Sequence, residues 1–169
     1  YESDRAGDTG GEPSLADMTG KAVTMLQREP AGFFLHVEGG RIDHAHHAGN
    51  ARRALVETIE FARAVRRAAE MTDPKDTLII VTADHSHTFT LAGYPHRGND
   101  ILGLVRQVPK VDGQNPAPAL AADGMPYTTL GYANGPGAVS GARGNPGSVD
   151  TTAPDYRQQA TVPFRGDAE

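Results

Sequence analysis

Histidine and carboxylate side chains form three groups that could bind metal ions. Glu38 ends a short apolar run, Asp43 begins the sequence DHAHH that ends at His47, and the sequence DHSH occupies 84–87 after a second apolar run. Asp43 and His47 are four residues apart, so a helical turn or a tight loop directs both side chains toward one point. Aspartate and histidine ligands without cysteine are typical of catalytic zinc, and Glu38 offers a hard oxygen suited to magnesium.

A strand, a helix and a second strand are expected to position these groups. The apolar runs 32–38 and 77–82 predict buried strands, and Asn50 can cap a helix that ends near Asp73. Such a unit crosses over right-handedly, so both strands end at one sheet edge, and Glu38 and Asp84 are expected to be neighbours there. Spacings of three and four residues place the apolar side of the helix at Leu55, Ile59, Ala62, Val65 and Ala69.

Two further parts of the chain have recognisable patterns. Ser14 and Asp17 have the spacing of a capping box, which predicts a helix whose apolar stripe is Leu15, Met18, Ala22, Met25 and Leu26. From Gly93 onward lie 12 of the 20 glycines and 9 of the 12 prolines, which predicts loops, with one strand at 127–132 before a turn at 134–137. These strands leave unpaired sheet edges, so more sheet is expected from sequence outside the chain.

Composition excludes several classes of protein. The 169 residues carry a formal charge of -5 with scattered Lys and Arg, which argues against binding to nucleic acid or to an anionic membrane surface. No apolar run approaches the ~18 residues of a membrane-spanning helix, so no transmembrane segment is expected. The absence of cysteine rules out disulfides, thiolate zinc sites and a cysteine nucleophile. The chain begins at Tyr1 without a targeting segment, as expected for an internal fragment.

Two segments carry a resemblance to a known family. The sequences FFLHVEGGRIDH at 33–44 and VTADHSH at 81–87 closely resemble the two metal-binding signatures of alkaline phosphatases. The similarity covers nearly the whole chain, because it extends through 12–15, 93–95, Gly98, 134–137 and 156–159. A histidine after Asp43 and the sequence Gly-Tyr-Pro at 93–95 make it more similar to the animal-like branch than to the enteric bacterial branch.

The resemblance implies an α/β fold, as part of a three-layer α/β/α sandwich with a mostly parallel central sheet and a loop-rich crown insertion. Residues 1–92 would be part of the core that carries the metal ligands, and 93–160 would be the crown-like region at the interface of a homodimer. Residues 161–169 would return toward the core and be truncated. Tyr94 would reach toward the active site of the partner subunit.

The resemblance also assigns metal ligands. It makes Asp43 and His47 ligands of a first zinc ion, Asp84 and His85 ligands of a second, and Glu38 a ligand of magnesium.

Three other residues receive roles from the resemblance, each with an alternative. His44 and His87 would orient ligands or phosphate, or would have plain loop roles. Glu12 lies where relatives with an additional calcium site have an acidic ligand, whose partners would precede Tyr1. Its alternative is a solvated carboxylate before a helix.

The activity implied is hydrolysis of phosphate monoesters by a serine nucleophile outside the chain, with two zinc ions and one magnesium ion. Ser86 is flanked by Asp84, His85 and His87, but adjacency in sequence does not make a catalytic triad. The nucleophile would precede Tyr1 and a further zinc histidine would follow the chain, so the 169 residues alone are expected to be inactive. Relatives are periplasmic or extracellular. The alternatives are a phosphodiesterase, sulfatase or phosphomutase of the same superfamily, and a non-catalytic metal-binding or interaction module.

Overall fold

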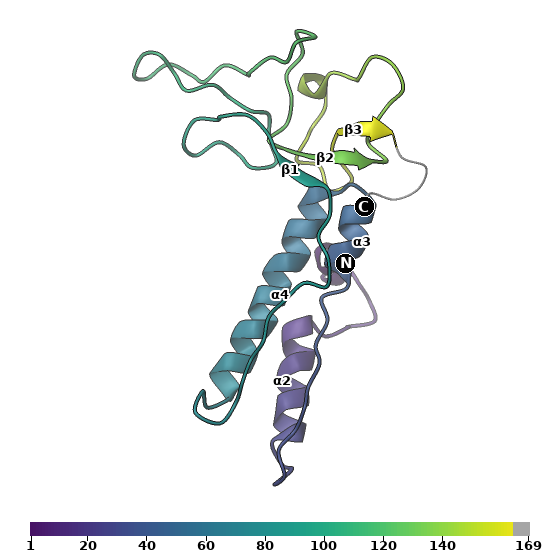
Figure 1. Cartoon of the computed structure of the whole chain (residues 1–169), viewed down its shortest axis with the longest axis vertical. Coiled ribbons are helices and arrows are strands. Elements are labelled where there is room, and N and C mark those ends of the chain that lie inside the picture. Colours follow the sequence, from purple (N-terminus) through teal and green to yellow (C-terminus); the bar gives the residue numbers. More distant parts are fainter. Residues whose placement is uncertain (164–169) are drawn as a thin grey trace. The chain divides into compact units, whose positions relative to one another are not determined.

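The computed structural model describes residues 1–163 as an α/β chain. These residues form four α-helices, one 3-10 helix at Pro146–Ser148 and a three-stranded mixed sheet (Figure 1). The chain divides into a first unit, Tyr1–Asp43 with Arg53–His85, and a second unit, His44–Arg52 with Ser86–Glu169. The end of the predicted return at 161–169 lies outside the described residues. None of the described helices is long and apolar enough to cross a membrane.

Three of the described helices lie wholly or mostly in the first unit. Helix α1 spans Glu2–Arg5, α2 spans Leu15–Leu26, and α4 spans Ala51–Met71. The capping box is confirmed: Asp17 N donates to Ser14 Oγ at 3.1 Å, and Ser14 N donates to Asp17 Oδ2 at 3.2 Å. These two bonds satisfy backbone donors at the start of α2 that would otherwise lack helical partners.

Small residues decide which side of α2 packs on α4. Thr19, Gly20 and Val23 are buried, and a Cβ at Gly20 would lie 3.0 Å from Arg67 Nε of α4. The predicted stripe was wrong, because Met18 is 50% exposed and Met25 58% exposed.

The predicted apolar side of α4 was also wrong. Ile59, which was expected to be on the buried side, is 54% exposed, whereas Ala54 and Ala64 are buried. In both helices small residues are buried while large apolar side chains stay exposed, and in α2 the small Gly20 lies beneath the Arg67 and Met71 side chains of α4.

The predicted strands at 32–38 and 77–82 are also wrong. Both segments lie in the first unit without strand or helix assignment, and Phe34, Leu78 and Ile80 are 90%, 83% and 76% exposed. A strand is defined by backbone pairing with a neighbour, and the described residues supply none for either segment. Apolar composition alone therefore did not make these segments strands.

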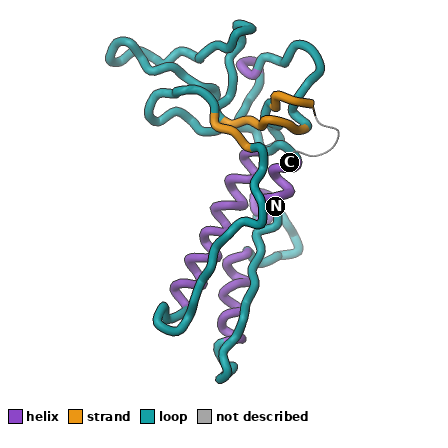
Figure 2. The backbone as a smooth tube through the Cα atoms, in the orientation of Figure 1, coloured by secondary structure: helices purple, strands orange, loops and turns teal. Residues whose placement is uncertain are grey.

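The second unit contains the sheet (Figure 2). Strands β1 (Phe89–Leu91), β2 (Leu130–Gly135) and β3 (Ala160–Pro163) follow the order β1-β2-β3, with β1 antiparallel and β3 parallel to β2. The strand predicted at 127–132 therefore begins three residues later. The turn predicted at 134–137 forms one residue later, at 135–138, where Ala138 N donates to Gly135 O at 3.1 Å.

Side-chain hydrogen bonds hold the long loops of the second unit. Arg143 makes a bidentate ion pair with Asp123 at 2.7 and 2.8 Å and donates to the carbonyls of Met125 and Pro126. The buried core beside these loops includes Val105, Leu130 and Gln158. The predominance of loops agrees with the glycine and proline content of this part of the chain.

Candidate metal centre

Helix α3, Arg41–His47, presents most of the predicted ligand motif. Asp43 and His47 lie one helical turn apart, so of the two expected conformations, a helical turn or a tight loop, the helical one forms. Gly40 precedes the helix, and a Cβ there would lie 3.3 Å from Glu38 Oε1. Glycine at this position leaves room for the Glu38 carboxylate beside the start of α3.

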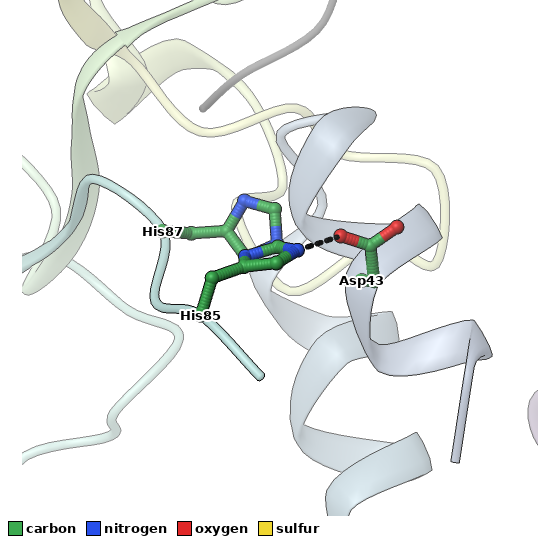
Figure 3. Close-up of side chains that lie close together, drawn as sticks. All are labelled: Asp43, His85 and His87. Atoms are coloured by element: carbon green, nitrogen blue, oxygen red, sulfur yellow. Dashed lines mark ion pairs between the residues drawn. The ribbon is translucent and has the colours of Figure 1, made fainter. Parts of the chain in front are cut away.

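Asp43 and His85 form an ion-pair contact within the first unit. His85 Nε2 lies 3.5 Å from Asp43 Oδ1 and 3.8 Å from Asp84 Oδ2. Figure 3 shows the His85 ring directed at the Asp43 carboxylate, with the contact drawn as a dashed line. Figure 3 also draws His87, which belongs to the second unit and is described with that unit below. The second and third predicted metal-binding groups therefore meet through Asp43 and His85.

The geometry of Asp43 and His85 fits a zinc ion. Two ligands on a tetrahedral zinc, with bonds of about 2.0–2.1 Å, stand roughly 3.3 Å apart. The observed 3.5 Å between Oδ1 and Nε2 is close to that separation. Asp84 is 93% exposed, and its carboxylate lies within reach of the same imidazole. Carboxylate and imidazole ligands are the donors that zinc accepts in the absence of thiolates.

Glu38 lines an open pocket of about 580 Å³ in the first unit. The charged residues of the lining are mostly acidic: besides Glu38 they are Glu2, Asp4, Asp8, Glu12, Glu57 and Glu60, together with Arg5 and Arg41. The expected proximity of Glu38 and Asp84 rested on two strands that are not formed. Carboxylate oxygens in this pocket are the donors that magnesium and calcium prefer.

Glu12 interacts with Asp8 in the same pocket. Their side-chain hydrogen bond raises the pKa of Glu12. The pKa of Asp8 is lowered, first by the backbone N–H of Gly10, which donates to it at 2.8 Å, and then by the bond with Glu12. A hydrogen bond between two carboxyl groups requires a shared proton, and a cation could replace that proton. The calcium site implied for Glu12 stays a prediction.

The second unit contains a group of packed rings that the sequence did not reveal. Tyr132 Oη lies 2.8 Å from His46 Nδ1, and the tyrosine is only 3% exposed. The His46 ring stacks on His87 with centroids 4.8 Å apart, and His87 meets His47 edge-on at 5.0 Å. Burial raises the pKa of Tyr132.

His46 stood in the recognised motif but received no predicted role. Its pairing with Tyr132 joins residues 86 positions apart, and no local pattern encodes that contact.

The other predicted residues lie on the surface of their units. His44 is exposed on α3, and Ser86 is exposed immediately after Asp84 and His85. Tyr94 in the second unit is 95% exposed.

An α/β chain in which an aspartate and a histidine lie at a separation compatible with zinc has a candidate metal site. The chain belongs to the alkaline phosphatase family, since the model of that family matches residues 1–168. This match confirms the resemblance drawn from the motifs at 33–44 and 81–87.

Curated relatives agree with the family match. The chain is 48% identical over 167 residues to the tissue-nonspecific alkaline phosphatase of Gallus gallus, covering 98% of this chain and 30% of the relative. It is 46% identical over 168 residues to the tissue-nonspecific isozyme of Homo sapiens, covering 98% and 29%. Alkaline phosphatase of Gadus morhua is 45% identical over 166 residues, covering 97% and 32%. The chain thus spans about 30% of the length of these relatives.

Proposed function

We propose that the whole protein hydrolyses phosphate monoesters and that this chain supplies most of its metal ligands. The observation that carries the proposal is the 3.5 Å contact between Asp43 and His85, in a chain of the alkaline phosphatase family. Residues 42 positions apart in sequence converge there, and the contact brings a carboxylate proposed for the first zinc ion beside an imidazole proposed for the second.

Each ligand has a proposed role. Asp43 and His47 hold the first zinc ion, and Asp84 and His85 hold the second. Glu38 holds magnesium from the acidic pocket of the first unit. When bound, the two zinc ions supply an activated nucleophile and stabilise the leaving oxygen. The contact between Asp43 and His85 supports adjacent ligand sets, since two-metal sites have ions about 3.5–4 Å apart.

The nucleophilic serine is proposed to lie outside this chain. The chain itself then binds metal and orients the ligands, and the full protein adds the attacking group. The predicted α/β/α sandwich would also be completed there, where strands could cover the exposed segments 32–38 and 77–82. We further propose a homodimer outside the cytoplasm, and the 95% exposure of Tyr94 supports its place at the dimer interface.

A chimera tests the proposed activity. The 167 aligned residues of the Gallus gallus alkaline phosphatase are replaced by the corresponding residues of this chain, and hydrolysis of p-nitrophenyl phosphate is measured. We expect zinc-dependent turnover that a chelator abolishes. His85→Ala should lower kcat/KM at least about 100-fold, since it removes a metal ligand.

The matched control is His96→Ala, which removes an exposed contact of Nδ1 with the neighbouring Arg97 carbonyl, at 2.8 Å. This variant should keep the activity of the chimera within about twofold. A folded chimera that binds zinc without hydrolysing the ester would reject the phosphatase proposal in favour of a non-catalytic metal-binding role. Equal losses in His96→Ala and His85→Ala would reject the ligand assignment.

A further inference from the structure

We propose that Tyr132 and His46 are positioning residues that fix the ring orientations of His87 and His47. This inference rests on the proposed function, because His47 is one of the proposed zinc ligands. Neither Tyr132 nor His46 is itself assigned to a metal ion. They act through two successive ring contacts within the second unit.

The position of Tyr132 is fixed by the sheet. Its residue pairs with Phe89 of β1 on one side and with Ala160 of β3 on the other. The ring is almost completely buried, and its centroid lies 5.3 Å from that of Phe89. A tyrosine in a middle strand has little freedom to move its hydroxyl away from His46 Nδ1.

The hydrogen bond with Tyr132 selects one form of His46. Burial raises the pKa of Tyr132, so the phenol keeps its proton at neutral pH. The Tyr132 hydroxyl and His46 Nδ1 lie 2.8 Å apart, and the proposal assigns the donor role to the phenol, which places the imidazole proton on Nε2. The sheet therefore sets both the tautomer of His46 and the plane of its ring.

The ring contacts transmit this orientation to His47. His46 stacks on His87 with an interplanar angle of 24°, and Phe89 meets His46 edge-on at 5.0 Å. His87 in turn meets His47 at an angle of 87°. Rotating the ring of His87 would disturb its contacts with both neighbours, so the imidazoles are held as a set.

Backbone bonds fix the segment that follows His47. The buried Gln158 donates its N–H to Gly49 O at 2.9 Å, and its Oε1 accepts from Ala51 N at 2.8 Å. Because Gln158 lies two residues before β3's Ala160, it ties the end of α3 to the sheet that carries Tyr132. The Tyr132 hydroxyl and the His47 backbone are therefore held on one framework.

Two substitutions separate the hydrogen bond from the ring stack. Tyr132→Phe removes the hydroxyl and keeps the aromatic ring in the sheet. His46→Asn keeps an acceptor near the position of Nδ1 but removes the imidazole that stacks on His87. Loss of an outer partner of a metal ligand typically lowers metal affinity about 10- to 100-fold. We expect about a tenfold loss of zinc affinity in each variant.

The experiment combines two measurements on the whole 169-residue chain. Zinc titration by calorimetry gives the affinity, and ¹⁵N NMR of the histidine side chains in the zinc-free chain gives the tautomer of His46. Tyr156→Phe is the control, since it removes the hydroxyl of a different, half-buried tyrosine of the second unit. Circular dichroism establishes that each variant is folded.

The proposal expects a single Nε2–H tautomer of His46 in the original chain, a tautomer mixture in Tyr132→Phe, and unchanged values in Tyr156→Phe. An unchanged tautomer together with zinc affinity within twofold of the original would overturn it. If Tyr132→Phe does not fold, the zinc affinity of His46→Asn replaces it, and an affinity within twofold of the original chain would overturn the proposal. If the original chain binds no zinc, the isolated chain does not form the proposed zinc sites by itself, whereas the His46 tautomer still decides the role of Tyr132.

Discussion

Replacing Gly137 by alanine should disrupt the packing of the turn after β2 on Gln158. A Cβ at Gly137 would lie 1.8 Å from the carbonyl oxygen of Gln158 and 2.9 Å from its carbonyl carbon. Both atoms belong to backbone, so the overlap cannot be relieved by rotating a side chain. The turn, or the segment before β3, must move by at least about 1 Å to reach normal contact.

The cost follows from what Gln158 holds. Relieving an overlap in a packed interior costs about 1–3 kcal/mol. Moving Gln158 also strains its bonds to Gly49 and Ala51, which are buried and are worth about 1 kcal/mol each. Together these effects predict a loss of about 4 kcal/mol in the free energy of unfolding. For a chain of this size the melting temperature should fall by about 8–16 °C.

Urea unfolding followed by circular dichroism measures this loss, with Gly144→Ala as the matched control. A Cβ at Gly144 would meet no atom within 4 Å, and its backbone φ is outside the left-handed region. The control should change the free energy of unfolding by less than about 1 kcal/mol. If Gly137→Ala also stayed within about 0.5 kcal/mol of the original chain, the close packing of the turn on Gln158 would be refuted.

Three further predictions test other parts of the chain. Ser14→Ala removes the cap of α2 and should cost about 1 kcal/mol in urea unfolding, whereas the exposed Thr24→Ala should cost less than about 0.5 kcal/mol; equal losses would contradict the capping role. The Arg143 side-chain hydrogen bond lowers the pKa of Asp123 to about 2, so its stabilisation is complete above the unfolded pKa of about 3.9 and is lost as the pH falls through 2. The urea midpoint should therefore fall more steeply below pH 4 in the original chain than in Asp123→Asn, and parallel pH profiles would argue against this ion pair. Zinc at 100 times its Kd should stabilise the chain by about 2.7 kcal/mol in thermal unfolding, and a chelator should reverse this stabilisation. Asp43→Asn should reduce the stabilisation by zinc. An undiminished zinc effect in that variant would remove Asp43 from the ligand set.

The helices could be predicted because their signals are local. Ser14 and Asp17 begin α2 through bonds between residues three positions apart, and the motif around Asp43 needs only one turn of α3. The packed sides of α2 and α4 were not predictable in this way. Gly20 is buried beneath the Arg67 and Met71 side chains of α4, and periodicity within one helix does not indicate which side chains of another helix will cover it.

The strands depend on partners far along the chain, and here local reasoning failed. The segments 32–38 and 77–82 have the apolar composition of buried strands, yet Leu78 and Ile80 are among the most exposed large side chains described. β2 pairs with the segment around Leu91 on one side and with the segment around Val162 on the other. It begins three residues later than the strand predicted from the sequence. Pairing, rather than propensity, sets the bounds of these strands.

The candidate site combines both kinds of information. Residue types and spacing identified Asp43 and His85 as ligands, because few side chains bind zinc and the motif concentrates them. Their 3.5 Å contact required the folded chain, and so did the bond from Tyr132 to His46. A metal site needs ligands of the right type and also neighbours that restrict how those ligands turn. Short motifs in the sequence indicate the first requirement. The second is met by residues such as Tyr132, whose role is visible only in the folded sheet, where its hydroxyl lies beside a histidine.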